Sequence, residues 1–214
     1  MRRLLFLFAL LFATPALASP CDQFFPNGKE IVVQGTQVVC HSFYASVYDT
    51  KHEANVFSTE ATQIKTNKVI RVDSFKADSK VDNSPTPEDY TNTGFDRGHM
   101  TPAADSSNST QMSDTFYMTN MTPQYPNVNR VAWKMLEETV RTMNTKNVVT
   151  GAIYNDYTHV IGKHKVPVPI ALYKVVYLTD GTIRAFWADN VKMNKSAICV
   201  DVAVVEKRSG IRFH

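Results

Sequence analysis

One amphipathic stretch, set between runs that resemble β-strands, constrains the fold more than any other feature of the sequence. From about Asn127 to Asn144, apolar residues recur at spacings of three and four, which indicates a helix with one apolar face; they are Trp133, Leu136, Val140 and Met143. Strands grouped before and after such a helix favour an α+β fold. We therefore expect a mainly antiparallel central sheet flanked by helices.

The strands expected after this helix have clear limits. They lie at residues 148–153, 171–178 and 183–187. The last two flank Asp180-Gly181, and an Asp-Gly pair supplies the positive φ angles that a tight hairpin turn needs. Residues 203–209 then form an amphipathic piece that ends at Gly210, which predicts a short helix.

The part before the helix gives weaker signals. Valine pairs at 32–33 and 38–39 flank Gly35 and predict a hairpin, while β-rich runs at 67–72 and 115–121 predict two further strands. The segment 76–92 is polar and contains two prolines, which indicates a surface loop.

The composition requires a fold built on a hydrophobic core. Of the 214 residues, 43% are hydrophobic and 20% are charged, which is typical of a globular protein and excludes a disordered or repetitive chain. Three cysteines are too few for a disulfide scaffold or a cysteine-rich zinc module. No repeat, Gly/Ser linker or charge block divides residues 19–214, so we expect one domain there.

The first 18 residues have the pattern of a secretory signal peptide. Arg2 and Arg3 precede an apolar run at 4–13, and Ala16-Leu17-Ala18 is a small-x-small cleavage pattern. That run is too short to cross a hydrocarbon core of about 30 Å as a helix. We expect a mature protein that is secreted or periplasmic and has no membrane span. Without the two arginines the net charge falls from +3 to +1, so any nucleic-acid binding must come from local clusters of charge.

Export would allow a disulfide bond to form. Cys21 and Cys40 are close in the sequence, whereas Cys199 stands far from both. Three pairings are possible. We expect a Cys21–Cys40 bridge, with Cys199 buried and reduced.

The tetrapeptide Asp96-Arg97-Gly98-His99 is the first candidate for chemistry. It places a potential base, a fixed cation and a carboxylate within four residues, and glycine permits unusual backbone angles beside the histidine. The alternative is a surface turn with an incidental ion pair. By itself the motif does not decide between the two.

Polar residues on the predicted helix form the second candidate. Asn129, Glu137 and Arg141 lie at spacings of eight and four, so Asn129 and Glu137 are about 12 Å apart along the helix and about 80° apart around it. A hydrated magnesium ion can bridge such a gap, because it keeps several waters and needs few protein oxygens. The alternative is an N-cap asparagine with a solvated Glu137–Arg141 pair.

Taken together, these motifs resemble the DNA/RNA non-specific endonuclease family, whose catalytic core is a ββα-metal, or His-Me, finger. The matching blocks are Asp96-Arg97-Gly98-His99, Thr101-Pro102-Ala103-Ala104-Asp105, Asn120-Met121-Thr122-Pro123-Gln124, and Asn129, Trp133, Leu136, Glu137 and Arg141. Several ordered blocks with correct spacing make the similarity specific. The resemblance implies a ββα-metal core at about residues 91–144.

The resemblance also implies roles for individual residues. His99 corresponds to the general base, Asn129 to the asparagine that holds the metal, and Glu137 to the glutamate that binds it through water. Arg97 and Arg141 correspond to arginines near the scissile phosphate. Asn120 is similar to the asparagine at the end of the second strand and is expected to orient the site. We assign Arg71, Asp96 and Arg130 to substrate binding.

The function that follows is an exported endonuclease that hydrolyses DNA and RNA with little sequence preference. Contacts to phosphate and sugar carry no sequence information, and one magnesium ion, for which manganese can substitute, would support the chemistry. The alternative is a non-catalytic exported nucleic-acid-binding relative. A phosphatase is less favoured, because such enzymes gather more carboxylates and histidines around two metals. The sequence neither identifies nor excludes a protein inhibitor as a further partner.

Overall fold

The computed structural model describes residues 19–62 and 69–213. The predicted signal peptide, residues 1–18, lies outside the described residues. So do the first two positions of the strand predicted at 67–72. In the described part of the chain, every helix is too short or too polar to cross a membrane.

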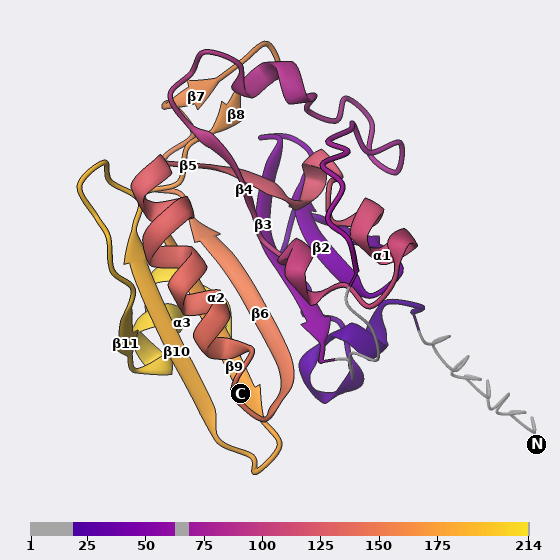
Figure 1. Cartoon of the computed structure of the whole chain (residues 1–214), viewed down its shortest axis with the longest axis vertical. Helices are drawn as coiled ribbons and strands as arrows, with labels where there is room; N and C mark the ends of the chain where they lie inside the picture. Colours follow the sequence, from indigo (N-terminus) through magenta and orange to yellow (C-terminus); the bar gives the residue numbers. More distant parts are fainter. Residues whose placement is uncertain (1–18, 63–68, 214) are drawn as a thin grey trace, which may run out of the picture.

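A seven-stranded sheet forms the centre of the molecule, and every neighbouring pair of strands in it is antiparallel. This confirms the predicted fold class. The order across the sheet is β1-β2-β3-β6-β9-β10-β11 (Figure 1). The strands are β1 (Gln37–Cys40), β2 (Tyr44–Asp49), β3 (Ala54–Ala61), β6 (Thr145–Ile153), β9 (Ala171–Leu178), β10 (Ile183–Asp189) and β11 (Ile198–Val200).

The two faces of the sheet bury different clusters because successive side chains of a strand point to opposite sides. In β9, Tyr173 and Val175 join a cluster that includes Val205 of α3 (Val202–Ser209). Leu172 and Val176 join a second cluster on the other face, under Trp133. Figure 1 shows α2 across one face of the sheet and α3 behind it.

The helix predicted at 127–144 covers the face of the sheet that contains Leu172 and Val176, and it has two parts. A π-helix, η6 (Val128–Trp133), runs directly into α2 (Lys134–Val140). Trp133, Leu136 and Val140 are buried against the sheet as predicted, but the helix ends at Val140, and Met143 beyond it is only partly buried. A π-helical turn widens the backbone and is frequent at functional sites.

A small antiparallel ribbon stands apart from the large sheet. It consists of β4 (Asp96–His99) and β5 (Met121–Gln124), so strand, strand and helix follow one another as β4, β5 and η6–α2. A second ribbon, β7 (Val160–Ile161) and β8 (Val166–Pro167), lies near it (Figure 1). The remaining elements are α1 (Ser109–Asp114) and the short 3-10 helices η1 (Asp22–Phe24), η2 (Pro26–Gly28), η3 (Pro87–Tyr90), η4 (Ala103–Asp105) and η5 (Met118–Asn120).

Three strand predictions are wrong. The hairpin across Gly35 does not form, because β1 pairs with β2 and Val32 is 86% exposed. Residues 69–72 are irregular. The strand predicted at 115–121 begins only at Met121, because the backbone N–H groups of residues 115–117 bond to carbonyls of α1 instead of a neighbouring strand.

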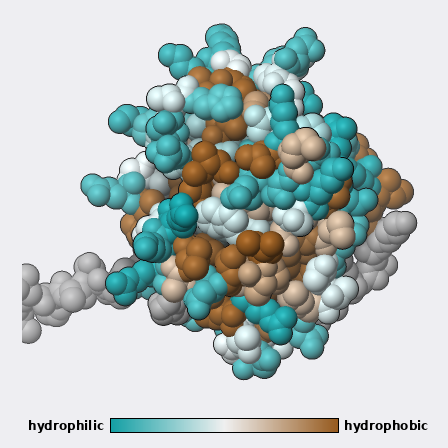
Figure 2. All heavy atoms as spheres, turned by 90° about the vertical axis from the view of Figure 1, so that its left-hand side faces the viewer, coloured by the Kyte–Doolittle hydropathy of each residue, from teal (hydrophilic) through white to brown (hydrophobic). Residues whose placement is uncertain are grey.

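The disulfide prediction is half right. Cys21 and Cys40 form the expected bridge, which ties the N-terminal segment to β1. Cys199 is free but exposed, so its predicted burial is wrong. It lies on β11, the edge strand of the sheet, whose residues are exposed or only partly buried. Figure 2 shows apolar side chains scattered among hydrophilic ones on this side of the molecule.

Candidate active site

The predicted site residues line one cavity of about 500 Å³ between the ribbon and the helix. Seven of them contribute to its wall: Arg71, Arg97, His99, Asn129, Arg130, Glu137 and Arg141. They come from three separate segments of the chain, and the fold of the ββα unit brings them together. Two predicted residues, Asp96 and Asn120, lie outside this wall.

His99 ends β4 and lies in an apolar corner of the cavity. The centre of its ring is 5.0 Å from that of Phe116, edge to face, and 6.0 Å from that of Phe75. Its Nε2 atom is buried and has no hydrogen-bond partner among the described residues. Burial, and next the charge of Arg71, lower the pKa of His99 to about 3. The imidazole is therefore neutral near pH 7, as a general base must be.

Asp96 anchors the start of the helix. Its carboxylate accepts two hydrogen bonds from Arg130, at 2.8 and 2.6 Å, and one from Nδ2 of Asn129, at 2.9 Å. Burial raises the pKa of Asp96, but the bonds from Arg130 and Asn129 outweigh it and the net shift is downward. The carboxylate thus stays ionised and holds the amide of Asn129 in one orientation.

The donor set fits a magnesium-like ion. Because Nδ2 of Asn129 donates to Asp96, the amide oxygen is the end left for a cation, and Glu137 supplies a carboxylate to the same cavity. Neutral and anionic oxygens are the ligands that magnesium prefers. Burial raises the pKa of Glu137 to about 7, against the opposing charge of Lys174. A bound cation would favour the ionised carboxylate.

Lys174 is a charged neighbour that the sequence analysis missed. It lies in β9 between Leu172 and Val176, is 1% exposed, and donates a 2.6 Å hydrogen bond to Thr150. Its Nζ lies 5.2 Å from the centre of the Trp133 ring. Burial lowers its pKa, while the carboxylates of Glu137 and Glu60 act in the opposite sense. In the sequence, the signal that could have revealed this buried charge is a single lysine in an otherwise apolar strand.

The arginines are held by different neighbours. Arg97 donates to the carbonyl of Pro87 in η3, at 2.7 Å from Nη2, and lies over the ring of Phe75. Arg71 pairs with Asp73 at 2.6 Å. Arg141 pairs with Asp105 at 3.3 Å, and its side chain is 28% exposed. These contacts place positive charge on several sides of the cavity.

Asn120 is buried behind the site instead of facing it. Its amide group donates to the carbonyls of Thr101 and Thr115, and its oxygen accepts from the backbone N–H of Thr101, each at 2.9 Å. Thr101 lies two residues after His99. These bonds suit the predicted orienting role, because they fix the backbone that leaves the histidine.

The ββα unit thus brings a neutral histidine, an asparagine and a glutamate to the wall of one cavity. The sequence matches the DNA/RNA non-specific endonuclease family over residues 26–214. The chain belongs to this family, whose members are metal-dependent nucleases.

Individual relatives agree with this assignment. The chain is 32% identical to mitochondrial endonuclease G of Bos taurus over 60% of its own length, but the match spans only 50% of the bovine protein. Nuclease C1 of Cunninghamella echinulata is 30% identical, with 88% of each chain covered. Among solved structures, EndoG in complex with EndoGI superimposes with a TM-score of 0.77 at 27% identity, covering 94% of this chain and 92% of that one.

Proposed function

We propose that this protein is a metal-dependent endonuclease that hydrolyses phosphodiester bonds in DNA and RNA with little sequence preference. The observation that carries the proposal is the convergence of His99, Asn129, Glu137 and four arginines on one cavity. Phosphodiester hydrolysis needs a base for water, stabilisation of charge on phosphoryl oxygens, and a position for the substrate. The cavity wall holds a group suited to each task.

In this proposal, His99 removes a proton from the attacking water. Arg97 and Arg141 lie where they can stabilise negative charge on the phosphoryl oxygens. Asp96 fixes Asn129 and Arg130 at the first turn of the helix. Arg71 and Arg130 line the rim and would bind flanking phosphates, contacts that do not depend on the base.

A single magnesium ion would be held by Asn129 and, through water, by Glu137. Such an ion supplies electrostatic stabilisation of the phosphoryl group and of the leaving oxygen. Manganese would fit the same oxygen ligands.

The direct test incubates purified mature protein with circular plasmid and with RNA. With magnesium, we expect closed circles to become linear and then short fragments, and RNA to be degraded. His99→Ala should lower turnover by about 10²- to 10⁴-fold, the usual effect of losing a general base. His159→Ala is a matched control, because His159 is exposed and lies outside the cavity. Near-normal cleavage by His99→Ala would remove this histidine from the role.

Metal removal gives a second, independent test. Excess EDTA should abolish cleavage by the wild type, and added magnesium or manganese should restore it. Asn129→Ala should require a higher metal concentration for half-maximal activity, because it lacks the amide oxygen. Full activity in EDTA, or an unchanged metal requirement in Asn129→Ala, would contradict the proposed metal site.

We also propose that the protein is exported to the periplasm or the medium. The basis is the pattern of residues 1–18 and the Cys21–Cys40 bridge, since such bonds persist in oxidising compartments. N-terminal sequencing of protein recovered outside the cytoplasm should begin at Ser19. A protein inhibitor is a further proposed partner; the solved EndoG structure contains one.

The two rival functions can be separated from this one. A non-catalytic binding relative would retain plasmid without cutting it. A two-metal phosphatase is less favoured because, in residues 19–62 and 69–213, no three histidine, cysteine, aspartate or glutamate side chains gather, whereas a pair of metal ions needs several such ligands.

A further inference from the structure

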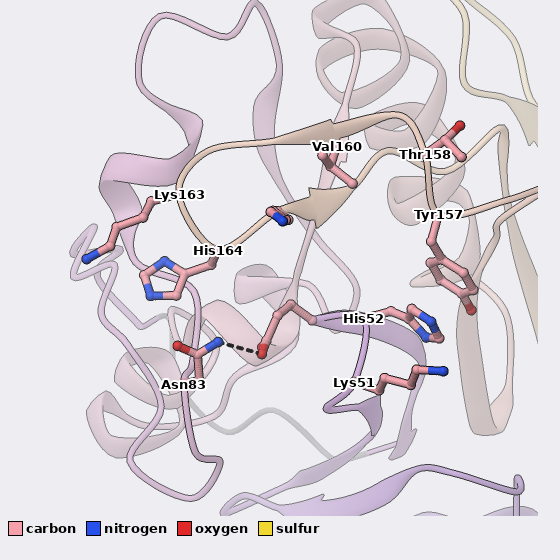
Figure 3. A pocket seen from close by; sticks show the side chains of 10 residues that line it. Lys51, His52, Asn83, Tyr157, Thr158, Val160, Lys163 and His164 are labelled. Carbon is pink, nitrogen blue, oxygen red and sulfur yellow. Dashed lines mark hydrogen bonds between the residues drawn. The ribbon is translucent and has the colours of Figure 1, made fainter.

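A second, larger cavity of about 670 Å³ lies outside the proposed active site. Three segments that are distant in the sequence form its wall: the turn between β2 and β3, the loop around Asn83, and residues 157–165, which contain β7 and the turn that follows it (Figure 3). Convergence of three turns on one hollow resembles a binding site, because loops held by a rigid scaffold commonly carry binding residues.

The backbone of this wall is unusual. Glu53, Asn83 and Lys165 have φ angles of 52°, 58° and 55°, in the left-handed region. Asparagine tolerates that region, but glutamate and lysine rarely adopt it. Strained residues cluster at functional sites, where the surrounding structure holds them in place. Here Glu53 is held by Asn83, which donates a 2.9 Å hydrogen bond to its carboxylate (Figure 3).

Positive charge dominates the side chains of the cavity. Lys51, Lys163 and Lys165 line it, together with His52 and His164. Each histidine has its Nδ1 atom against a carboxylate, His52 at 2.6 Å from Asp49 and His164 at 2.7 Å from Asp89. Figure 3 shows Lys51 and Lys163 on opposite sides of the hollow, so these lysines suit successive phosphates of a strand.

One wall of the cavity is aromatic. The ring of Tyr157 stacks on that of His52, with centres 3.9 Å apart and planes 6° apart, and Tyr154 stacks against Tyr157 at 5.5 Å. Tyr157 remains 38% exposed, and the side chain of His52 is 29% exposed. An exposed ring stack beside positive charge is how single-stranded nucleic acid is bound without sequence preference.

The short helix η3 connects this cavity to the proposed active site. The carbonyl of Pro87 accepts hydrogen bonds from Arg97, which lines the active site. Two residues on, Asp89 accepts from the ring and the backbone N–H of His164, which lines the second cavity. One helical turn therefore contacts a wall residue of each hollow, Arg97 on one side and His164 on the other.

We propose that the second cavity binds a short stretch of a single-stranded nucleic acid, with successive backbone phosphates beside Lys51, Lys163 and Lys165 and one base against the Tyr157–His52 stack. The choice of ligand rests on the proposed function. The site would hold a strand that leaves the active site, and would increase affinity for substrates long enough to reach it.

The test measures binding of a fluorescein-labelled oligo(dT) strand by anisotropy in EDTA, so that no cleavage occurs. Changing Lys51, Lys163 and Lys165 together to Gln should raise the Kd about 10-fold and reduce the salt dependence by a slope of about 2, as expected for three lost phosphate contacts. The matched control changes three exposed lysines elsewhere to Gln: Lys29, Lys146 and Lys207. Equal Kd values for the two triple variants would overturn the proposal.

The aromatic part is tested separately with Tyr157→Leu. This variant should bind oligo(dT) at least 5-fold more weakly but bind an abasic strand of the same length as well as the wild type does, because stacking needs a base. Equal effects on both strands would show that the base does not stack there.

Competition with inorganic phosphate and with thymidine monophosphate shows whether the cavity binds a strand or only small anions. If either displaces the strand at an equal concentration of phosphate groups, the cavity is a small-anion site and the strand proposal is wrong.

These outcomes are independent of catalysis. Cleavage of a substrate too short to span η3 should be unchanged in the lysine triple variant, since none of the three lies in the active-site wall. If the wild type cuts nothing but still binds strands through these lysines, the proposed function fails and the binding site stands. If it cuts normally and the lysines do not matter, only the second site fails.

Discussion

The His99 ring lies among aromatic side chains, and its environment determines its protonation. Two phenylalanine rings surround it, and Arg71 adds a nearby positive charge, so protonation is disfavoured. A base with so low a pKa is always available near neutral pH, although it holds a proton weakly once it has taken one. Substrate phosphate, which carries negative charge, would raise the pKa of His99 when bound.

This environment predicts an acid-sensitive contribution to stability. The unfolded chain protonates this imidazole below about pH 6.5, whereas the folded protein does so only near pH 3. Between these values the unfolded state binds the extra proton, so acid favours unfolding by up to about 1.4 kcal/mol per pH unit. Above pH 6.5 both states are neutral and the effect disappears. Thermal denaturation from pH 7 to pH 4 should show a smaller fall in Tm for His99→Ala than for the wild type, and parallel curves would contradict this.

Two other residues show how far chemistry can be read from single positions. Asp96 was assigned to substrate binding, but its carboxylate is occupied by Asn129 and Arg130, so it would act by positioning them. No role was predicted for Lys174. A lysine among apolar residues of one strand is nevertheless informative, because its side chain points to a buried face of the sheet and then needs a polar or charged partner there. Its carboxylate neighbours come from β3 and α2, and sequence spacing cannot reveal such distant contacts.

At the scale of elements, the β4–β5 ribbon depends on one close approach. Gly98 lies opposite Thr122, and a Cβ atom there would overlap the side chain of Gln124, which is fully buried. From the sequence, we expected this glycine to matter for its backbone freedom. In the structure it matters because it has no side chain, which leaves room for Gln124 against β4.

Gly98→Ala should therefore separate β4 from β5 or displace Gln124. We expect a loss of about 1–3 kcal/mol in the free energy of unfolding, the usual cost of overpacking, together with lower activity because β4 carries His99. Chemical denaturation and plasmid cleavage measure the two effects. Adding Gln124→Ala removes the overlapping atoms and should recover part of the activity. No recovery would mean that the overlap is not the cause.

The elements that sequence predicted well are those with a strong local pattern. The strands β6, β9 and β10 and the helix α3 have continuous apolar runs or a clear cap, and each forms close to the expected limits. Strands β2 and β3 were not predicted, although they lie inside the sheet. Their polar residues, such as Ser46 and Ser58, are buried and bond to each other across the strands. Composition alone cannot distinguish such pairs from a loop.

At the scale of the whole molecule, segments that are distant in the sequence pack against each other. The first described residues pack with the last, since Phe24, Phe25 and Phe213 share one cluster on the sheet. The active site could be predicted because its motifs lie within a short stretch of about 50 residues. The second cavity could not, because its three turns become neighbours only after the sheet has formed.

The Cys21–Cys40 bridge should stabilise this arrangement as a whole. It closes a loop with a sequence separation of 19, and a loop of that size contributes about 3 kcal/mol by restricting the unfolded chain. Reduction should lower the Tm by roughly 6–12 °C and leave activity at 25 °C intact, because neither cysteine lines the proposed active site. Calorimetry with and without reductant, beside a Cys199→Ser control, measures the effect. An unchanged Tm would show that the bridge adds no stability.

The helix α2 forms a partition between two hollows. Lys134, Glu137 and Glu138 face the active site, whereas Met135, Leu136 and Thr139 border a smaller cavity that also contains the exposed thiol of Cys199. A maleimide dye attached there would rest against the side of the helix opposite the proposed active site. Its emission would report whether α2 shifts when a strand binds, and constant emission would show that the helix stays in place.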